Sequence, residues 1–348
     1  MAADVKDQRA AESVMAENNV KNDSMSSRRV RFRIIIVGVL GFLALALLAE
    51  LALRLFFADK LSQVIRIDER NLCYRHDADL GWFPIENSEL EFTASRTFHI
   101  RHNSLGFRDE EFGPKERPRI AFIGDSFVWG FDVNEEERFT ELIQKQISDW
   151  QILNLGVSGY GTDQELLLLT EYYDQLKPDI VFLLFDLSLD NDTGDNRTNL
   201  RYGGYYKPYF VEKEGGSLQV KGVPVPDSPN FYILGPDSLE AKVFLFRAIM
   251  KLQFWWSSPA EVSIKDPTLK LIPTIRDYVA EKGGKFAIGF EAMNDSLREL
   301  CEEKSLFHVD LSTDDRYPEF GKHWTPAAHV FVAEKVLELL KNNGWVGK

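Results

Sequence analysis

Residues 119–126 read Arg-Ile-Ala-Phe-Ile-Gly-Asp-Ser, a short apolar run that ends in a glycine and two polar residues. The first five residues are bounded by a proline and a glycine, as is typical of a buried strand. We expect Ser126 to follow that strand in a loop, because the next helix is predicted only after Gly130. Open α/β sheets bind their ligands at this edge. The motif differs from the G-x-S-x-G nucleophile elbow, because Val128 occupies the position of its second glycine.

Strands and helices alternate from residue 117 onward. The predicted strands are Arg119–Ile123, Gln151–Leu155, Ile180–Phe185, Lys285–Gly289 and Leu306–Val309, preceded by Glu89–Thr93 and Thr97–Ile100. The predicted helices are Glu135–Asp149, Asp163–Gln175, Leu239–Phe254, Thr268–Lys282, Asp295–Glu303 and Pro326–Asn342. Such alternation predicts a parallel sheet that helices cover on both faces.

Three later segments carry residues that complement a serine nucleophile. They are Asn154-Leu-Gly-Val-Ser-Gly159, Asp190-Asn-Asp192 and His323-Trp-Thr-Pro326. Glycine and asparagine offer N–H donors to a developing oxyanion, and histidine offers a base. A nucleophile, oxyanion donors and a base are the minimum set for acyl transfer.

Each candidate also has a purely structural interpretation. Ser126 could cap a helix, and we expect Asp125 to fix its loop by accepting backbone N–H groups. Gly159 could simply serve a turn. His329 falls in register with the apolar residues of the last predicted helix, so we expect a packed side chain. His323 instead precedes that helix, in front of a threonine cap and a proline, where it can point at Ser126.

The four segments together resemble the SGNH, or GDSL, hydrolase superfamily over roughly residues 117–345. The resemblance implies an α/β fold of the flavodoxin-like type, with three α/β/α layers around a parallel sheet. It also implies that Ser126 is the nucleophile and His323 the general base. Gly159 and Asn191 would donate to the oxyanion, through the backbone and the side chain respectively. No metal and no cofactor is expected.

The third member of a catalytic triad has no obvious counterpart. The superfamily has an aspartate two or three residues before the histidine, where this chain has Gly321 and Phe320. Glu319 is the nearest carboxylate, and Asp314 and Asp315 lie further upstream. We expect a dyad in which a backbone carbonyl orients the imidazole, with a Glu319 triad as the alternative.

The composition is that of an ordinary globular protein, with 44% hydrophobic and 27% charged residues among 348. The net charge of -13 argues against a nucleic-acid partner, because such partners select basic patches. The two cysteines, Cys73 and Cys301, lack metal-site spacing, so a zinc site is not expected. A disulfide between them would require an oxidising compartment, and the sequence leaves their pairing open.

An N-terminal apolar segment predicts a membrane anchor. Residues 34–53 are almost wholly apolar and match the length of a bilayer-spanning helix. Arginines precede them at positions 28, 29, 31 and 33, so the positive-inside rule places residues 1–33 in the cytoplasm and the remainder on the other side. A cleaved signal peptide is the alternative, but the preceding segment is long and no A-x-A-like site follows.

The chain therefore divides into four predicted regions. They are a disordered cytoplasmic tail (1–33), an anchor (34–57), a β-rich lead-in (58–116) and a catalytic domain (117–348) with an insertion at about 194–236. The insertion follows Asn191 directly, so we expect it to overhang the site. We expect Arg108 to form a surface salt bridge, with an anion or sugar contact as the alternative. Trp255 and Trp256 are expected in the core, with a sugar-stacking surface or a membrane-interface belt as alternatives.

Three functions are compatible with these residues. The first is a serine ester hydrolase that acts outside the cytoplasm on an acylated carbohydrate or lipid. The second is an O-acyltransferase for an exported polysaccharide, because the His-Trp-Thr-Pro segment is similar to that of SGNH proteins with this activity. The third is a non-catalytic binding protein, which the missing aspartate favours. The hydrolase is our expectation, with the membrane and an ester-bearing small molecule or carbohydrate as partners.

Overall fold

A five-stranded parallel sheet forms the centre of the molecule. The computed structural model describes residues 30–62, 65–66, 73–187, 206–227, 232–233, 238–257, 266–319 and 322–347. The sheet strands are β6 (Arg119–Ile123), β7 (Gln151–Asn154), β8 (Ile180–Phe185), β12 (Lys285–Phe290) and β13 (Phe307–Asp310). Their order is β13-β12-β8-β6-β7, and every neighbouring pair is parallel. This is the flavodoxin-like strand order, which confirms the predicted fold class.

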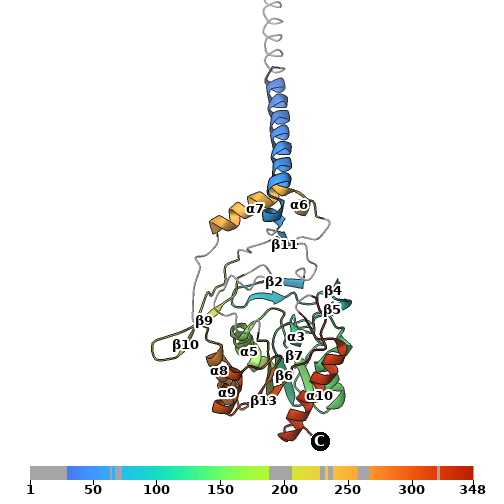
Figure 1. The fold of residues 1–348 in the computed structure, drawn as a ribbon, viewed down its shortest axis with the longest axis vertical. Helices are drawn as coiled ribbons and strands as arrows, with labels where there is room; N and C mark the ends of the chain where they lie inside the picture. Colours follow the sequence, from blue (N-terminus) through green and yellow to red (C-terminus); the bar gives the residue numbers. More distant parts are fainter. Residues whose placement is uncertain are drawn as a thin grey trace, which may run out of the picture.

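Helices cover both faces of this sheet and give three layers (Figure 1). One face packs against α5 (Thr162–Leu176), α8 (Thr268–Glu281) and α9 (Asp295–Lys304). The other face packs against α4 (Phe139–Gln146) and α10 (Pro326–Asn342). Strand β8 explains why both faces are covered. Its alternate side chains belong to two different apolar clusters, one on each side of the sheet. A strand covered on both faces needs a continuous apolar sequence, which is what residues 180–185 provide.

Two predicted helices are interrupted in the structure. The stretch predicted as Glu135–Asp149 forms a 3-10 helix, η2 (Glu135–Glu137), and then α4, because Arg138 between them is extended. The stretch predicted as Leu239–Phe254 divides into α6 (Leu239–Lys242) and α7 (Phe244–Ser257). Three predicted strands, Arg119–Ile123, Ile180–Phe185 and Glu89–Thr93, match the observed ones, and the other four differ by one residue at one end or, for β13, at both ends.

Two antiparallel hairpins precede the sheet in the sequence. They are β2 (Tyr74–Asp77) with β3 (Gly81–Pro84), and β4 (Glu89–Thr93) with β5 (Thr97–Arg101). Both hairpins pack on the segments that follow the sheet strands. The indole N–H of Trp82 donates to the carbonyl of Ser158 at 3.1 Å, and Phe98 packs against Trp129. The hairpins thus support the loops at the carboxyl edge of the sheet.

Two further strand pairs lie outside the central sheet. In Figure 1, β11 lies between the sheet and the N-terminal helix, and β9 and β10 lie at one side of the sheet. Part of the predicted insertion forms a hairpin of β9 (Tyr209–Glu212) and β10 (Leu218–Lys221), and β1 (Ile65–Arg66) pairs with β11 (Tyr232–Ile233).

The N-terminal helix, Val30–Phe56, has 27 residues and a mean hydropathy of 2.7, so it is long and apolar enough to cross a membrane. The short α2 (Ala58–Ser62) follows. Cys73 and Cys301 are both buried, and no disulfide joins them.

Candidate active site

Ser126 begins a four-residue helix, α3 (Ser126–Trp129), directly after β6. The sequence predicted a loop here, and this prediction was wrong because Asp125 caps a helical turn. The backbone N–H of Phe127 donates to the Asp125 carboxylate at 2.9 Å, as expected for a structural carboxylate. Gly124 makes the sharp turn possible: its φ is 156°, and a Cβ there would lie 2.9 Å from the carbonyl oxygen of Leu184.

Ser126 and His323 meet although they are 197 residues apart in the sequence. The His323 Nε2 atom lies 2.8 Å from the Ser126 Oγ atom, which is hydrogen-bonding distance. The two residues are 2% and 5% exposed, so water has little access to this contact. His323 precedes Thr325, whose hydroxyl caps α10 by accepting the N–H of Ala328. The cap fixes where α10 begins and thereby where the imidazole lies.

Two aromatic rings hold the imidazole of His323. The ring of Phe131 lies 4.3 Å from it, centroid to centroid, with 30° between the planes. The ring of Phe127 lies 5.2 Å from it at 47°. The carbonyl of His323 also accepts the N–H of Tyr317 at 2.9 Å. Packing and backbone contacts thus restrict the orientation of the candidate base.

The segment after β7 runs beside the Ser126 turn. The N–H of Val157 donates to the carbonyl of Gly124 at 3.0 Å, and the side-chain amide of Asn154 donates to the carbonyl of Val128 at 2.7 Å. The N–H of Gly156 is used within its own turn, where it donates to the Asn154 side chain at 3.0 Å. This use makes Gly156 a poor oxyanion donor. Gly159 lies three residues further on, in the left-handed region with φ 83°.

The third predicted segment, which contains Asn191, lies outside the described residues. The structure therefore gives no position for this predicted oxyanion donor. The strand that leads to it, β8, does end at the same sheet edge as β6, beside the candidate nucleophile.

Buried carboxyl groups surround the turn that carries Ser126. Burial raises the pKa of Asp125 well above its ordinary value, and the neighbouring charge of Asp186 raises this pKa further. Burial likewise raises the pKa of Glu165 well above its ordinary value, and the like charges of Asp125 and Asp163 raise this pKa further. These shifts favour neutral carboxyls. Neutral neighbours matter chemically, because ionised ones would oppose the negative charge that develops in acyl transfer.

The carboxylates upstream of His323 have other contacts. Glu319 is exposed, and its backbone carbonyl closes a turn by accepting the N–H of Lys322 at 3.1 Å. Asp315 accepts the hydroxyl of Thr325 at 2.7 Å and so supports the start of α10. The positions that hold the aspartate in the resembled superfamily, 320 and 321, lie outside the described residues.

A buried arginine supports the far end of α3, and the sequence analysis missed it. Arg108 is 1% exposed, and its guanidinium donates to the carbonyls of Trp129, Gly130 and Val133 at 3.2, 2.5 and 2.8 Å. Both interpretations of Arg108 as a surface residue were therefore wrong. The last carbonyls of a helix have no partner inside it, and Arg108 supplies donors for those of α3. Burial lowers the pKa of Arg108 to about 9.

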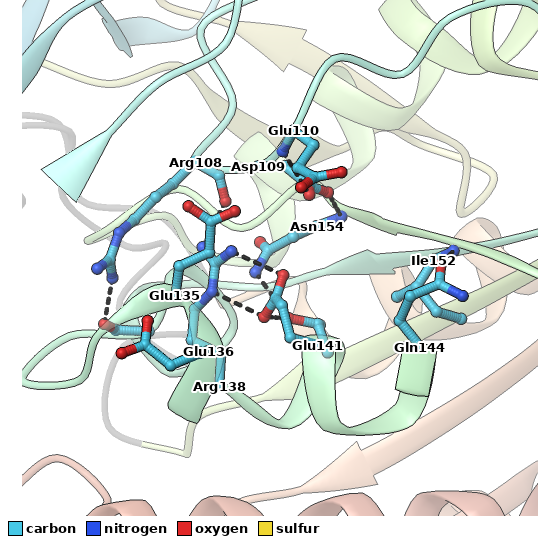
Figure 2. A network of polar contacts seen from close by, with 12 residues as sticks. Arg108, Asp109, Glu110, Glu135, Glu136, Arg138, Glu141, Gln144, Ile152 and Asn154 are labelled. Carbon is cyan, nitrogen blue, oxygen red and sulfur yellow. Dashed lines mark hydrogen bonds and ion pairs between the residues drawn. The ribbon is translucent and has the colours of Figure 1, made fainter. Parts of the chain in front are cut away.

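A second buried arginine extends this network, as Figure 2 shows. Arg138 donates to the carbonyl of Arg108 and pairs with Glu141 at 2.7 Å. Close by, the carboxylate of Asp109 accepts the N–H of Asn154 at 2.8 Å. The network therefore links the chain before β6 to both segments that flank Ser126. Residue spacing alone does not distinguish such buried arginines from exposed ones.

His329 is packed in the core, which confirms the prediction. It is buried, and its ring stacks on Phe139 with centroids 6.0 Å apart and 10° between planes. The N–H of Phe139 donates to the Nδ1 atom of His329 at 3.2 Å. Burial, together with the charge of Arg138, lowers the pKa of His329 to about 3. The imidazole is therefore neutral at physiological pH and belongs to the structure rather than to the candidate site.

No protein-family model matches the chain, and no curated protein matches it. Among solved structures, it is similar to a member of the lipolytic protein G-D-S-L family from Veillonella parvula DSM 2008, with 14% identity over 64% of this chain and 98% of that one, at a TM-score of 0.37.

Two further solved structures show the same level of similarity. One is the psychrotrophic esterase EstA from Pseudoalteromonas sp., with 10% identity over 64% of this chain and 97% of that one, at a TM-score of 0.37. The other is a GDSL-like lipase from Bacteroides thetaiotaomicron VPI-5482, with 11% identity over 67% of this chain and 92% of that one, at a TM-score of 0.35. These three proteins are described as a lipolytic protein, an esterase and a lipase.

Proposed function

We propose that this chain is a membrane-anchored serine ester hydrolase. The observation that carries the proposal is the 2.8 Å contact between the Ser126 Oγ atom and the His323 Nε2 atom. A serine hydroxyl is a weak nucleophile until an adjacent base accepts its proton, and this contact supplies the base. The edge of the sheet where the two residues meet is the edge at which open α/β folds bind ligands.

The proposed reaction proceeds through an acyl-enzyme. His323 accepts the hydroxyl proton while the Ser126 Oγ atom bonds to the ester carbonyl carbon, and the carbonyl oxygen becomes an oxyanion. The N–H of Gly159 and the side-chain amide of Asn191 are the proposed donors to that oxyanion. The protonated imidazole then gives its proton to the leaving alcohol as the carbon–oxygen bond breaks. Water, deprotonated by His323, hydrolyses the acyl-serine in the reverse sequence.

We propose an extracytoplasmic location for the site and an acylated carbohydrate or lipid as the substrate. Arg31 and Arg33 lie at the start of the Val30–Phe56 helix, and arginine near a spanning helix favours the cytoplasmic side. The site then lies on the opposite side of the membrane. Acylated carbohydrates and lipids are the ester-bearing molecules that such a location makes available, and the motif resemblance points to the same class.

Ester cleavage by the purified full chain tests the hydrolase proposal. The chain is incubated with a chromogenic acetyl ester, and a phosphonate probe that reacts with activated serines is applied in parallel. Ser126→Ala should reduce turnover by several orders of magnitude and abolish labelling. Ser148→Ala is the matched control, because Ser148 is exposed and remote from the site. Wild-type turnover in Ser126→Ala would overturn the proposed mechanism.

The fate of the acyl group separates hydrolysis from transfer. An acceptor polysaccharide is added to the same assay, and the acetyl group is followed by mass spectrometry. Free acetate at undiminished yield supports the hydrolase, whereas acetylated polysaccharide would show that the chain is an O-acyltransferase instead.

Protease protection tests the proposed location. A protease is added to sealed vesicles of known orientation. We expect the protease to digest the sheet domain when it is added on the extracytoplasmic side and to leave it intact when it is added on the cytoplasmic side.

A further inference from the structure

Helix α7, Phe244–Ser257, carries two apolar faces, and the structure covers one of them. The covered face consists of Phe246, Met250 and Phe254, which pack in a small cluster with Leu61 of α2 and Leu53 of the N-terminal helix. The spacing of four residues between these three side chains places them along one side of the helix. This side attaches α7 to the segment that emerges from the N-terminal helix.

The second apolar face of α7 is largely open to solvent, although Leu245 at its start is half-buried. It is formed by Leu245, Ile249, Leu252 and Trp256, whose spacings of four, three and four residues define a single helical stripe. Ile249 and Leu252 are 53% and 65% exposed, and Trp256 is 84% exposed. Trp255 beside it is 77% exposed, so the expectation of core packing for both tryptophans was wrong. An apolar stripe of this length on a surface indicates a binding partner.

The start of α7 is fixed to the N-terminal helix by hydrogen bonds. The carboxylate of Glu50 accepts the N–H groups of Phe244 and Leu245 at 3.0 and 2.7 Å. These are the first N–H groups of α7, which have no partner within the helix, and an anion there also favours the helix dipole. Arg54 donates to the carbonyl of Lys242 and lies over the ring of Phe244 at 4.8 Å. Figure 1 shows the result, with the orange α7 lying across the lower end of the blue N-terminal helix.

The length of the N-terminal helix sets the depth of this junction. Its 27 residues extend about 40 Å at about 1.5 Å each, whereas the hydrocarbon core of a bilayer is about 30 Å thick. About 10 Å of helix therefore lies outside the hydrocarbon. Arg33 and Arg54 bound the apolar run and are 21 residues apart, or about 32 Å along the axis, so each lies near one surface of the hydrocarbon core. Arg54 lies one turn after Glu50 and also contacts the start of α7, so the start of α7 lies near the level of the lipid headgroups.

Cationic side chains flank the junction on the same side of the membrane. They come from the end of the N-terminal helix, from α2, from α6 and from α7 itself: Arg54, Lys60, Lys242, Arg247 and Lys251. Lysine and arginine suit the level of the headgroups, because their aliphatic stems can lie along apolar surface while their charged groups stay in water. Tryptophan is enriched at the same level, where its ring bridges apolar and polar surroundings.

We infer that α7 lies in the membrane interface beside the spanning helix, with the stripe Leu245, Ile249, Leu252 and Trp256 inserted among the lipids. The bilayer is the occupant of this face because the stripe is continuous with a helix that itself contacts lipid and lies at headgroup depth. The chain is then held at the membrane by two elements, the spanning helix and α7. Glu50, the one acidic residue within the apolar segment, joins them.

Site-directed spin labelling of the full chain in nanodiscs tests this inference. The discs contain phosphatidylcholine and phosphatidylglycerol, and nitroxides are attached to Leu252→Cys, Ile249→Cys and, as the matched control, Lys251→Cys. The native Cys73 and Cys301 are buried, so the introduced thiol is labelled preferentially. Oxygen partitions into lipid, whereas a nickel chelate stays in water. The ratio of spin relaxation by oxygen to spin relaxation by the chelate should be several-fold higher for the labels at 252 and 249 than for the label at 251.

Two outcomes overturn the inference. Equal accessibility ratios at 252 and 251 would mean that the stripe faces water. Protection of 252 and 249 from both reagents would mean that protein, such as a second copy of the chain, covers the stripe. A second measurement needs no cysteine: brominated lipids should quench less tryptophan fluorescence in Trp256→Phe than in the wild-type chain. An unchanged quenched fraction would count against insertion of Trp256.

Discussion

The imidazole of His323 packs on the ring of Phe131, with 4.3 Å between centroids, and the ring of Phe127 lies further away, at 5.2 Å. Such packing selects one orientation of the ring, which matters because proton transfer from Ser126 needs the Nε2 atom at hydrogen-bonding distance. A misplacement of about 1 Å can lower a rate by about 100-fold. Phe131 is therefore a positioning residue for the candidate base.

We expect Phe131→Leu to lower kcat for ester cleavage by about 10-fold while KM changes little, because the base moves but the substrate surface does not. Phe92→Leu is the matched control. Phe92 belongs to the same aromatic cluster, and its ring lies 5.9 Å from that of Phe131 and 5.7 Å from that of Phe98, centroid to centroid. Both variants should lose similar stability in urea unfolding. A similar loss of kcat in Phe92→Leu would show that general loosening, not positioning, causes the effect.

Loss of the Arg108 guanidinium should destabilise the fold strongly. Arg108→Met leaves buried carbonyls of Trp129, Gly130 and Val133 without their donors, and each such group costs about 1–3 kcal/mol. We expect the free energy of unfolding to fall by about 3 kcal/mol or more. Arg101→Met is the control, because Arg101 forms a partly exposed ion pair with Glu135, worth about 1 kcal/mol at most. Equal losses in the two variants, measured by urea titration, would contradict the role assigned to Arg108.

The stability of the protein should fall as the pH decreases from about 6.5 toward 3, in part because of His329. The unfolded chain binds a proton on this histidine below its ordinary pKa of 6.5, whereas burial keeps the folded pKa at about 3. The unfolded state thus binds more protons in this window, so stability decreases with decreasing pH, by about 1.4 kcal/mol per pH unit at most for one group. The N–H of Phe139 also requires an unprotonated Nδ1 atom.

Urea titrations between pH 4 and 7 measure this dependence. His329→Gln should be less stable than wild type at pH 7, because the stacked ring is lost, but its stability should vary less with pH. His99→Gln provides the comparison, because His99 lies on the surface beside Glu89. An unchanged slope in His329→Gln would mean that other groups cause the acid sensitivity. Loss of ester cleavage without loss of stability in the same variant would identify His329, not His323, as the base.

Much of the sheet and the Ser126–His323 pair could be predicted because their physical signals are local and strong. Strands buried on both faces are continuous apolar runs, so residues 119–123 and 180–185 stand out in the sequence. Parallel strands place their carboxyl ends at one edge, so polar segments that follow such runs converge there. The threonine and proline after His323 mark the start of α10, and this cap fixed the position of the histidine as well.

Other features could not be predicted, because different environments select the same residue types. The helical spacing of Trp255 and Trp256 with Ile249 and Leu252 suits a protein core and a lipid surface equally well, and only the structure shows these side chains exposed. Likewise, Arg108 follows a buried phenylalanine, yet a charged residue in an irregular segment is usually exposed. The helical turn at Ser126 was missed because four residues are too few to show a period.

The group that orients the imidazole of His323 decides between a catalytic dyad and a triad. Glu319 is exposed and uses its backbone carbonyl in a turn, whereas Asp315 holds Thr325 at the start of α10. We therefore expect Glu319→Gln to change kcat by less than about threefold, since a dyad does not depend on its charge. Asp315→Asn weakens the Thr325 contact, so it should lower the melting temperature modestly while kcat stays within about threefold. A drop of about 100-fold in Glu319→Gln at unchanged melting temperature would exclude the dyad and make Glu319 the third member of a triad, because loss of an orienting acid lowers turnover without unfolding the protein.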